Sequence, residues 1–167
     1  VADFLRQVEK DALVATIIPE TSEAYLEFVN TNRQVLLEKR DGVVVRTLAP
    51  LYKEMALIDR NGNERIKIVD GKLVPQSELV NVSDPANTTY KSEDYFAQAA
   101  ELEKAEVYMS PVTGWYVNRE SFEAGKRFEG IIRIAAPIFD QLGLSGQVVL
   151  TLDARHLAKF TNNIMPT

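Results

Sequence analysis

The sequence of 167 residues contains no cysteine, and it has a single histidine, His156, and a single tryptophan, Trp115. The lack of cysteine excludes disulfide bonds, thiolate metal sites, iron–sulfur clusters and a cysteine nucleophile. With one histidine, a metal site built from several imidazoles is excluded as well. We therefore expect no metal and no cofactor, and we expect His156 to be a surface residue near the start of a helix.

Long hydrophobic runs and an excess of positive charge are missing too. No stretch approaches the ~20 apolar residues that a membrane-spanning helix needs, and no signal peptide is recognisable. The chain carries 19 Lys and Arg against 24 Asp and Glu, a net charge of -5, and its basic residues are scattered singly. This distribution argues against binding to a nucleic-acid backbone. Because the sequence begins at Val1 in what reads as the middle of a helix, we expect it to be a segment of a longer protein.

The residues that are present have the composition of one soluble globular domain. Hydrophobic residues make up 46% of the chain and charged residues 26%. A chain of this length can bury roughly 70% of the surface that its unfolded form exposes. A hydrophobic core can therefore hold the fold together without disulfide or metal cross-links.

Helical periodicity dominates the N-terminal part. Apolar residues recur at spacings of three and four over 4–15 and again over 25–37, which is the period of one helix face. Pro19 between the two runs predicts a kink or a restart. If both runs form one rod as far as Lys39, it spans about 55 Å at 1.5 Å per residue, so part of it should protrude or meet a partner. A turn signal ends this run, and a third short helix is predicted over 44–52.

The remaining sequence reads as strands joined by turns and one long loop. Asn61-Gly62 is a strong hairpin signal between two short apolar runs. A polar, proline-containing stretch over 75–93 predicts a surface loop of the length that often forms functional lids, and a short helix over 95–102 should follow it. The strands are predicted at 55–59, 65–69, 106–110, 131–136 and 147–153.

This order of elements predicts an α+β domain in which a long N-terminal helix packs on a five-stranded antiparallel sheet. We expect residues 1–54 to form an N-terminal helical region of that domain and residues 55–167 to form its sheet-containing core. No internal repeat or low-complexity segment divides the chain.

Side chains of successive strand residues point to opposite faces of a sheet, which separates two kinds of residue in the late strands. One face collects aliphatic residues that suit packing against the N-terminal helix: Ile132, Ile134, Ala136, Val148, Leu150 and Leu152. The other face collects hydroxyl, aromatic and charged residues: Tyr108, Ser110, Arg133, Thr151 and Asp153. Such a polar face is either solvated or lines a pocket, and the 75–93 loop with the following helix could cover it.

Arg133 stands out because it lies between isoleucines in a strand. A buried guanidinium there needs a carboxylate partner from the protein or from a ligand, whereas on a half-solvated sheet the same arginine would simply be exposed. Tyr95 and Phe96 could stack on a ligand or anchor the core. Trp115 and Tyr116 could form a pocket rim or pack down on the domain.

Five segments resemble the Cache (PDC, PAS-like) sensor domain family, in order along nearly the whole chain: Met55–Gly62, Tyr90–Phe96, Glu106–Pro111, Ile132–Asp140 and Gly146–Asp153. Members of this family are extracytoplasmic ligand-binding modules between two membrane helices of bacterial and archaeal histidine kinases, chemoreceptors and cyclic-di-GMP enzymes. The resemblance implies that 55–167 is a PAS-like Cache sensor core preceded by the long helix. It also implies that this segment is not itself an enzyme.

The resemblance implies a mechanism as well. A small molecule would bind between the sheet and the loop–helix cover, and a shift of the long helix would carry the signal across the membrane in which the parent protein is anchored. The same helix would form the contact of a homodimer. By position, the implied ligand-binding residues are Tyr95, Phe96, Tyr108, Ser110, Trp115, Tyr116, Arg133 and Asp140.

One position departs from the amino-acid-binding subgroup of this family. That subgroup carries an arginine two residues before a Trp-Tyr pair, whereas here Glu93 precedes Tyr95-Phe96. The arginine that would hold an α-carboxylate is therefore missing, and we hypothesise that Arg133 instead holds the carboxylate of an organic acid. Two other interpretations stay open: a ligand-free dimerisation or interaction module, and a small hydrolase that uses Asp and Glu carboxylates.

Overall fold

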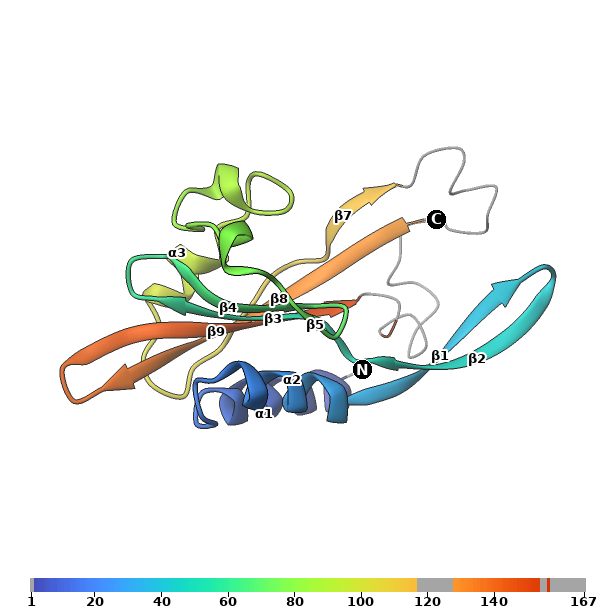
Figure 1. Ribbon diagram of the computed structural model, residues 1–167, viewed down its shortest axis with the longest axis horizontal. Helices are drawn as coiled ribbons and strands as arrows, with labels where there is room; N and C mark the ends of the chain where they lie inside the picture. The colour runs from blue at the N-terminus through green and yellow to red at the C-terminus, as the bar shows by residue number, and fades with distance from the viewer. Residues whose placement is uncertain (1, 117–127, 154–155, 157–167) are drawn as a thin grey trace.

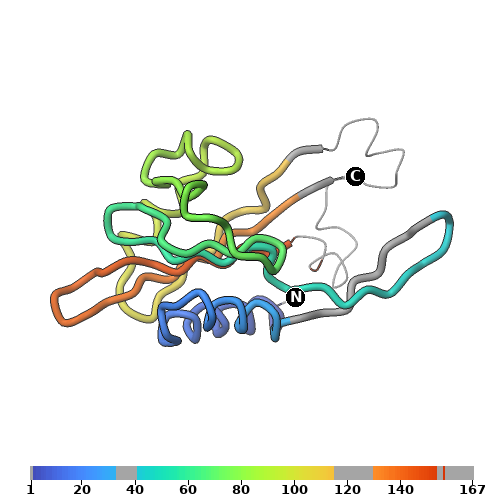
Figure 2. Tube along the Cα trace, in the orientation of Figure 1, coloured from blue at the N-terminus to red at the C-terminus, as the bar shows by residue number. Residues whose placement is uncertain are grey.

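The computed structural model describes residues 2–116, 128–153 and 156, and for 33–40, 115–116 and 128–129 it describes the backbone alone (Figure 2). Along the chain, the helices and strands are α1 (Ala2–Ala15), α2 (Ser22–Thr31), β1 (Arg33–Arg40), β2 (Val43–Pro50), β3 (Tyr52–Asp59), β4 (Glu64–Val69), β5 (Lys72–Leu73), α3 (Tyr95–Ala100), β6 (Tyr108–Met109), β7 (Thr113–Tyr116), β8 (Phe128–Asp140) and β9 (Gly143–Asp153). Short 3₁₀ turns at Gln76–Glu78 and Pro85–Asn87 lie in the loop between β5 and α3.

A seven-stranded antiparallel sheet forms the centre of the molecule (Figure 1). Its strands run in the order β5-β4-β3-β9-β8-β6, and β7 also pairs with β8. The longest strands, β8 and β9, pair from Ile131 with Asp153 to Asp140 with Gly143. The five predicted strands are present as β3, β4, β6, β8 and β9, and the α+β class is confirmed. The sheet is wider than predicted because β5 and β7 add two short strands.

The N-terminal helical stretch is two helices rather than one rod. α1 ends at Ala15, and α2 begins at Ser22 after Thr21, whose hydroxyl accepts a hydrogen bond from the N–H of Ala24 at 3.2 Å. Such a cap satisfies an N–H group that would otherwise lack a partner, so the chain can start a new helix after Pro19. Both helices lie against one face of the sheet, α1 on β8 and β9 and α2 on β3 and β4 (Figure 1). The helix restart that Pro19 predicts is therefore confirmed, and the two runs do not form one rod.

Residues 33–50 form a two-stranded hairpin instead of the predicted helix end and third short helix. β1 pairs with β2 from Arg33 with Pro50 to Arg40 with Val43. At the tip, Asp41-Gly42 has positive φ values of 50° and 79°, as a type I′ turn requires. The hairpin projects from the rest of the molecule, so the region 1–54 is only partly helical (Figure 1). The helical prediction failed because the short apolar runs beside the turn fit a strand as well as a helix.

The sheet separates two hydrophobic clusters. On one face, buried side chains of α1 and α2 pack against aliphatic strand residues, among them Ile132, Ile134, Ala136, Val148, Leu150 and Leu152. On the other face, a smaller cluster joins Ala135 and Val149 of the sheet to Tyr95 and Ala99 of α3. The loop over 75–93 and α3 cover this second face (Figure 1). The assignment of faces from strand alternation is therefore confirmed.

Candidate functional site

Arg133 lies on the sheet face that the 75–93 loop and α3 cover. It sits in β8 opposite Thr151 of β9, and strand alternation directs its side chain away from the aliphatic cluster. Only 4% of the residue is exposed. Its backbone N–H donates to the Ser110 hydroxyl at 2.8 Å, which ties the end of β6 to β8. A charge buried to this degree must be compensated inside the protein.

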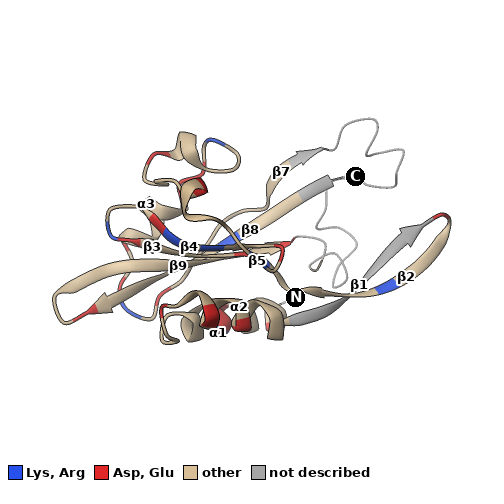
Figure 3. Cartoon of the chain, in the orientation of Figure 1, with Lys and Arg blue, Asp and Glu red and all other residues tan. Residues whose placement is uncertain are grey.

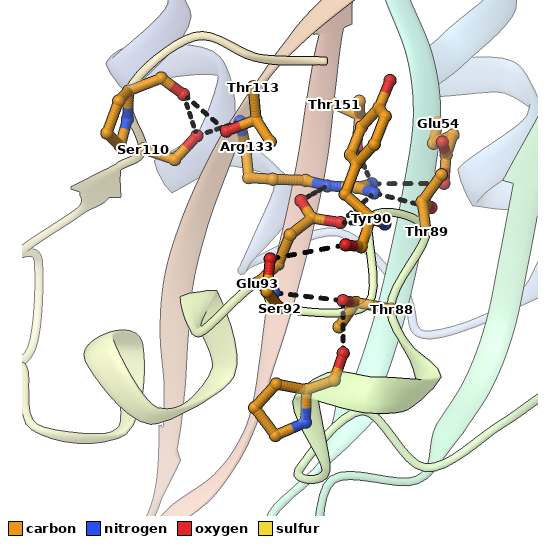
Figure 4. A network of polar contacts seen from close by, with 12 residues as sticks. Glu54, Thr88, Thr89, Tyr90, Ser92, Glu93, Ser110, Thr113, Arg133 and Thr151 are labelled. Atoms are coloured by element: carbon orange, nitrogen blue, oxygen red, sulfur yellow. Dashed lines mark hydrogen bonds and ion pairs between the residues drawn. The ribbon is translucent and has the colours of Figure 1, made fainter. Parts of the chain in front are cut away.

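All five N–H donors of the Arg133 guanidinium are used by acceptors of the protein (Figure 4). Glu93 forms a two-pronged ion pair, with Nε 2.9 Å from Oε1 and Nη2 3.2 Å from Oε2. Nη1 donates to Glu54 Oε1 at 3.3 Å and to the Thr151 hydroxyl at 2.6 Å. Nη2 also donates to the Thr89 hydroxyl at 2.9 Å. The carboxylate partner that burial of this arginine requires therefore comes from the chain itself.

Two features of the surroundings stabilise the charged guanidinium. Burial alone would lower the pKa of Arg133, but the carboxylates of Glu54 and Glu93 raise it above its usual value. The guanidinium carbon also lies 5.2 Å from the centre of the Tyr95 ring, in a cation–π arrangement. Arg133 therefore acts as a permanent positive charge on the covered face.

The network of ion pairs extends from β8 and β3 to the neighbouring strand β4. Lys67 Nζ lies 3.2 Å from Glu64 Oε2 and 3.7 Å from Glu54 Oε1. The other oxygen of Glu64 accepts the N–H of Val80 at 3.1 Å, so the same network also holds the loop. Figure 3 shows the basic positions on β4 and β8 among acidic ones. Because Arg133 and Lys67 face three carboxylates, the network carries one excess negative charge.

Glu93 organises the loop that covers the site. Its N–H donates to the Thr88 hydroxyl at 3.2 Å, and its Oε2 accepts the N–H of Tyr90 at 3.3 Å. The Thr88 hydroxyl in turn donates to the carbonyl oxygen of Pro85 at 2.6 Å. The last part of the loop is therefore folded around the same side chain that holds Arg133 (Figure 4).

Neither carboxylate partner of Arg133 was among the predicted site residues. The sequence marks Glu93 as a departure from the arginine of a family subgroup, and it gives Glu54 no such mark. The two lie 40 and 79 positions from Arg133 along the chain, so no spacing pattern links them to it. The one available signal for Glu54 was its position directly before the apolar run 55–58.

A pocket of about 190 Å³ opens beside the network, between α3, β6 and the start of β7. Its lining residues are Ser92, Glu93, Asp94, Tyr95, Tyr108, Ser110, Pro111, Thr113 and Arg133. Four of the predicted ligand-binding residues are thus brought together around one pocket: Tyr95, Tyr108, Ser110 and Arg133.

Two tyrosines reflect the electrostatics of this pocket. Burial, and then the carboxylates of Asp94 and Glu93, raise the pKa of the Tyr108 hydroxyl. Burial is also the main reason that the pKa of Tyr95 is raised, with Arg133 opposing the shift and Glu93 adding to it. Both shifts therefore reflect burial first and the neighbouring carboxylates second.

The other predicted site residues lie elsewhere. Phe96 is half-buried and packs against the smaller hydrophobic cluster instead of lining the pocket. Asp140 lies at the distal end of the β8–β9 hairpin, where its Oδ1 accepts the N–H of Leu142 at 2.7 Å. The backbone of Trp115 and Tyr116 belongs to β7, but their side chains lie outside the described residues.

His156 is buried, which corrects the prediction of a surface histidine. It is 1% exposed, and its Nε2 lies 3.1 Å from the carbonyl oxygen of Pro50. Within the described ranges, no group of three or more His, Asp or Glu side chains is placed to hold a metal ion. None of the helices in this part of the chain has the length and apolar character needed to cross a membrane.

Comparison with solved structures identifies the fold; no protein-family model and no curated protein matches the chain. A domain of a sensory box/GGDEF family protein from Vibrio parahaemolyticus has a TM-score of 0.58 at 19% identity, over 96% of this chain and 57% of that one. The sensory domain of the Campylobacter jejuni chemoreceptor Tlp3 has a TM-score of 0.51 at 13% identity, over 96% and 55%. The ligand-binding domain of the Pseudomonas aeruginosa amino acid chemoreceptor PctC, in complex with GABA, has a TM-score of 0.50 at 9% identity, over 97% and 56%.

The chain spans just over half the length of these three solved structures, between 55% and 57%. Identities of 9% to 19% establish a shared fold and nothing finer. The chain therefore has the fold of the sensory domains of chemoreceptors and of a GGDEF family protein, which confirms the resemblance to the Cache family at the level of the fold.

Proposed function

We propose that this chain is the extracytoplasmic small-molecule sensing domain of a bacterial or archaeal transmembrane receptor, either a histidine kinase, a chemoreceptor or a cyclic-di-GMP enzyme. The observation that carries the proposal is the polar pocket beside Arg133, under a loop cover on the sheet face opposite α1 and α2. The fold shared with sensory domains supports the same assignment. The proposal assigns binding, not catalysis, to this segment.

The two faces of the sheet supply a route from the pocket to the helices. A ligand that contacts α3, β6 and Arg133 would favour one position of the loop cover over another. β8 and β9 carry Arg133 and Thr151 on one face and the contacts of α1 on the other. A shift of these strands would therefore move α1, which would pass the signal to the membrane-anchored remainder of the parent protein.

A thermal-shift screen of the 167-residue chain against amino acids, organic acids and amines tests the proposal. A ligand that binds only the folded state raises Tm, because it adds about 2.7 kcal/mol of stability at 100 times its Kd. Tyr108→Ala, which removes part of the pocket wall, should abolish the shift. Leu142→Ala is the control, since Leu142 is 95% exposed and is not among the lining residues. The proposal fails if no compound raises Tm, or if Tyr108→Ala keeps the full shift.

A second function, a ligand-free dimerisation or interaction module, is favoured by two observations. The donors of Arg133 that a ligand could have used are already taken by the protein's own side chains. Exposed apolar residues also occur near the end of α1 and at the start of β2: Val14, Ile17, Val43 and Val44. Sedimentation equilibrium separates the two functions, because a dimer whose Tm responds to no small molecule would support the module. Dimerisation through α1 belongs to both proposals.

A further inference from the structure

The guanidinium of Arg133 has no donor left for a ligand. A ligand carboxylate would need two parallel N–H donors, and Glu93 already accepts from Nε and Nη2, which have that geometry. The other donor positions are taken by Glu54, Thr151 and Thr89. Glu93 thus occupies, from within the chain, the place that the carboxylate of an organic acid would take.

The charge around the pocket is negative in sum. In the network itself, two cations are opposed by three carboxylates, those of Glu54, Glu64 and Glu93. Asp94 adds a further carboxylate at the pocket wall, and Arg133 is the one cation among the nine lining residues. Because charges in a partly buried pocket are weakly screened, this excess attracts a cation and repels an anion.

The pocket also offers the acceptors that an ammonium group needs. Asp94 Oδ2 accepts a hydrogen bond from Gln98 Nε2 at 3.0 Å. Among the described residues, none donates a hydrogen bond to Asp94 Oδ1, so this oxygen could accept one from a ligand. The hydroxyl-bearing residues Tyr108 and Ser92 line the same pocket. A volume of about 190 Å³ is close to the ~150 Å³ of a cavity that holds one benzene molecule, so the ligand is small.

We infer that the pocket binds a small protonated amine and rejects small carboxylates, and that Glu93 is the residue that sets this preference. The inference rests on the proposed sensing function, whose ligand class it names. It replaces the organic acid expected from the sequence, because that expectation required free guanidinium donors on Arg133.

Two ions of similar shape and opposite charge, propylammonium and propionate, test the charge preference on the 167-residue chain. Thermal shift and isothermal calorimetry are measured for each at equal ionic strength. Propylammonium should raise Tm and give a saturable heat of binding, and propionate should do neither. Binding of propionate alone, equal binding of both ions, or binding of neither would overturn the inference.

The broad screen separates a failure of this inference from a failure of the proposed function. If a neutral or anionic compound raises Tm and Tyr108→Ala abolishes that shift, the pocket is a sensing site and the amine preference is wrong. If no compound of any class binds, both proposals are wrong.

Variants at Glu93 test its role directly. Glu93→Ala frees the Nε and Nη2 donors of Arg133 and removes one negative charge. Propionate should then bind saturably and raise the Tm of the variant, while propylammonium binds about tenfold or more weakly. Glu101→Ala is the matched control, since it removes the same charge from an exposed position just after α3 and should bind as the parent chain does. If Glu93→Ala gains no affinity for propionate, Glu93 does not set the preference.

Asp94→Asn provides a second test that does not disturb the ion pair, should Glu93→Ala fail to fold. The Asp94 side chain makes no capping hydrogen bond to α3, so the amide can replace it without loss of the helix start. This variant should bind propylammonium several-fold more weakly and still reject propionate. Unchanged affinity for propylammonium would contradict an electrostatic preference.

Discussion

Among single residues, Arg133 decides the character of the covered face. Its guanidinium loses its hydration on burial, and two carboxylates and two hydroxyls replace the lost water. Such a network contributes little net stability, because the attraction between the charges is offset by the cost of removing them from water. Removal of one partner has a larger effect, because the others are then left buried without compensation.

Arg133→Met should therefore lower the free energy of unfolding by about 3–5 kcal/mol, because Glu93 and Glu54 lose their buried counter-charge. Adding Glu93→Gln and Glu54→Gln to this variant should recover part of the loss. Arg65→Met is the control: the Arg65 side chain is 65% exposed in its ion pair with Asp59, and its loss should cost no more than ~1 kcal/mol. Urea denaturation of the parent chain and of the three variants measures these differences. A loss for Arg133→Met as small as that of the control would contradict the compensating role.

Among the secondary-structure elements, the β3–β4 hairpin shows how a local signal becomes a rigid turn. Asp59 Oδ1 accepts the N–H groups of Asn61 at 2.9 Å and Asn63 at 3.0 Å. Gly62 has a φ of +93°, and a Cβ there would come within 2.7 Å of Ser83, so a side chain would clash with the loop. The hairpin predicted from Asn61-Gly62 is confirmed, and the Asp59 side chain holds its turn.

These hydrogen bonds also make the turn sensitive to pH. Burial by itself would raise the pKa of Asp59. The pKa is nevertheless held below its usual value by hydrogen bonds from the N–H groups of Asn63 and Asn61 and from the Asn63 side chain, and by the charge of Arg65. A carboxyl with a lowered folded-state pKa adds stability above its unfolded pKa of about 3.9 and loses that stability as the pH falls through the folded value. The parent chain should therefore exceed Asp59→Asn in stability at neutral pH, and the difference should shrink below about pH 4. Urea midpoints of both proteins, measured from neutral pH to below about pH 4, give this stability difference. A difference that stays constant over this pH range would contradict the prediction.

For the domain as a whole, the sheet divides a tightly packed side from a lightly packed one. On the helix side, one large cluster joins aliphatic residues of α1, α2 and the strands. On the other side the cluster is smaller, and much of the 75–93 loop is exposed and held by polar contacts to Glu64 and Arg133. Segments held in this way open more easily than packed cores. The loop cover is therefore the part of the domain best suited to move when a ligand binds.

Hydrogen exchange should reveal this difference in local stability. Amides of β8 and β9 should exchange only on global unfolding, and amides of residues 75–93 should exchange at least about tenfold faster. A ligand in the pocket should slow exchange most over 88–95, because these residues contact the pocket or fold around Glu93. Mass spectrometry with and without propylammonium measures both effects. Equal protection of the loop and the central strands would contradict the proposed mobility.

Much of this architecture was predictable from short stretches of chain. Alternation along a strand is a property of neighbouring residues, so it located five strands of the central sheet, though not β1 and β2, and it assigned Arg133 and Ile134 to opposite faces. The turn at Asn61-Gly62 was predictable for the same reason. The sequence also indicates that Arg133, if it is buried between isoleucines in a strand, needs a carboxylate partner, but it leaves open whether the residue is buried or exposed.

Contacts between distant segments were not predictable in this way. Residues 33–50 carry apolar runs that fit a helix or a strand, and pairing across their turn selected the strand. Glu93 and Glu54 meet Arg133 only because the loop cover and β3 converge on the same face as β8. The carboxylate that pairs with Arg133, and with it the balance of charge around the pocket, follows from the folded arrangement. Electrostatic partners far apart in the chain leave no trace in local periodicity, whereas the folded chain brings them within hydrogen-bond distance.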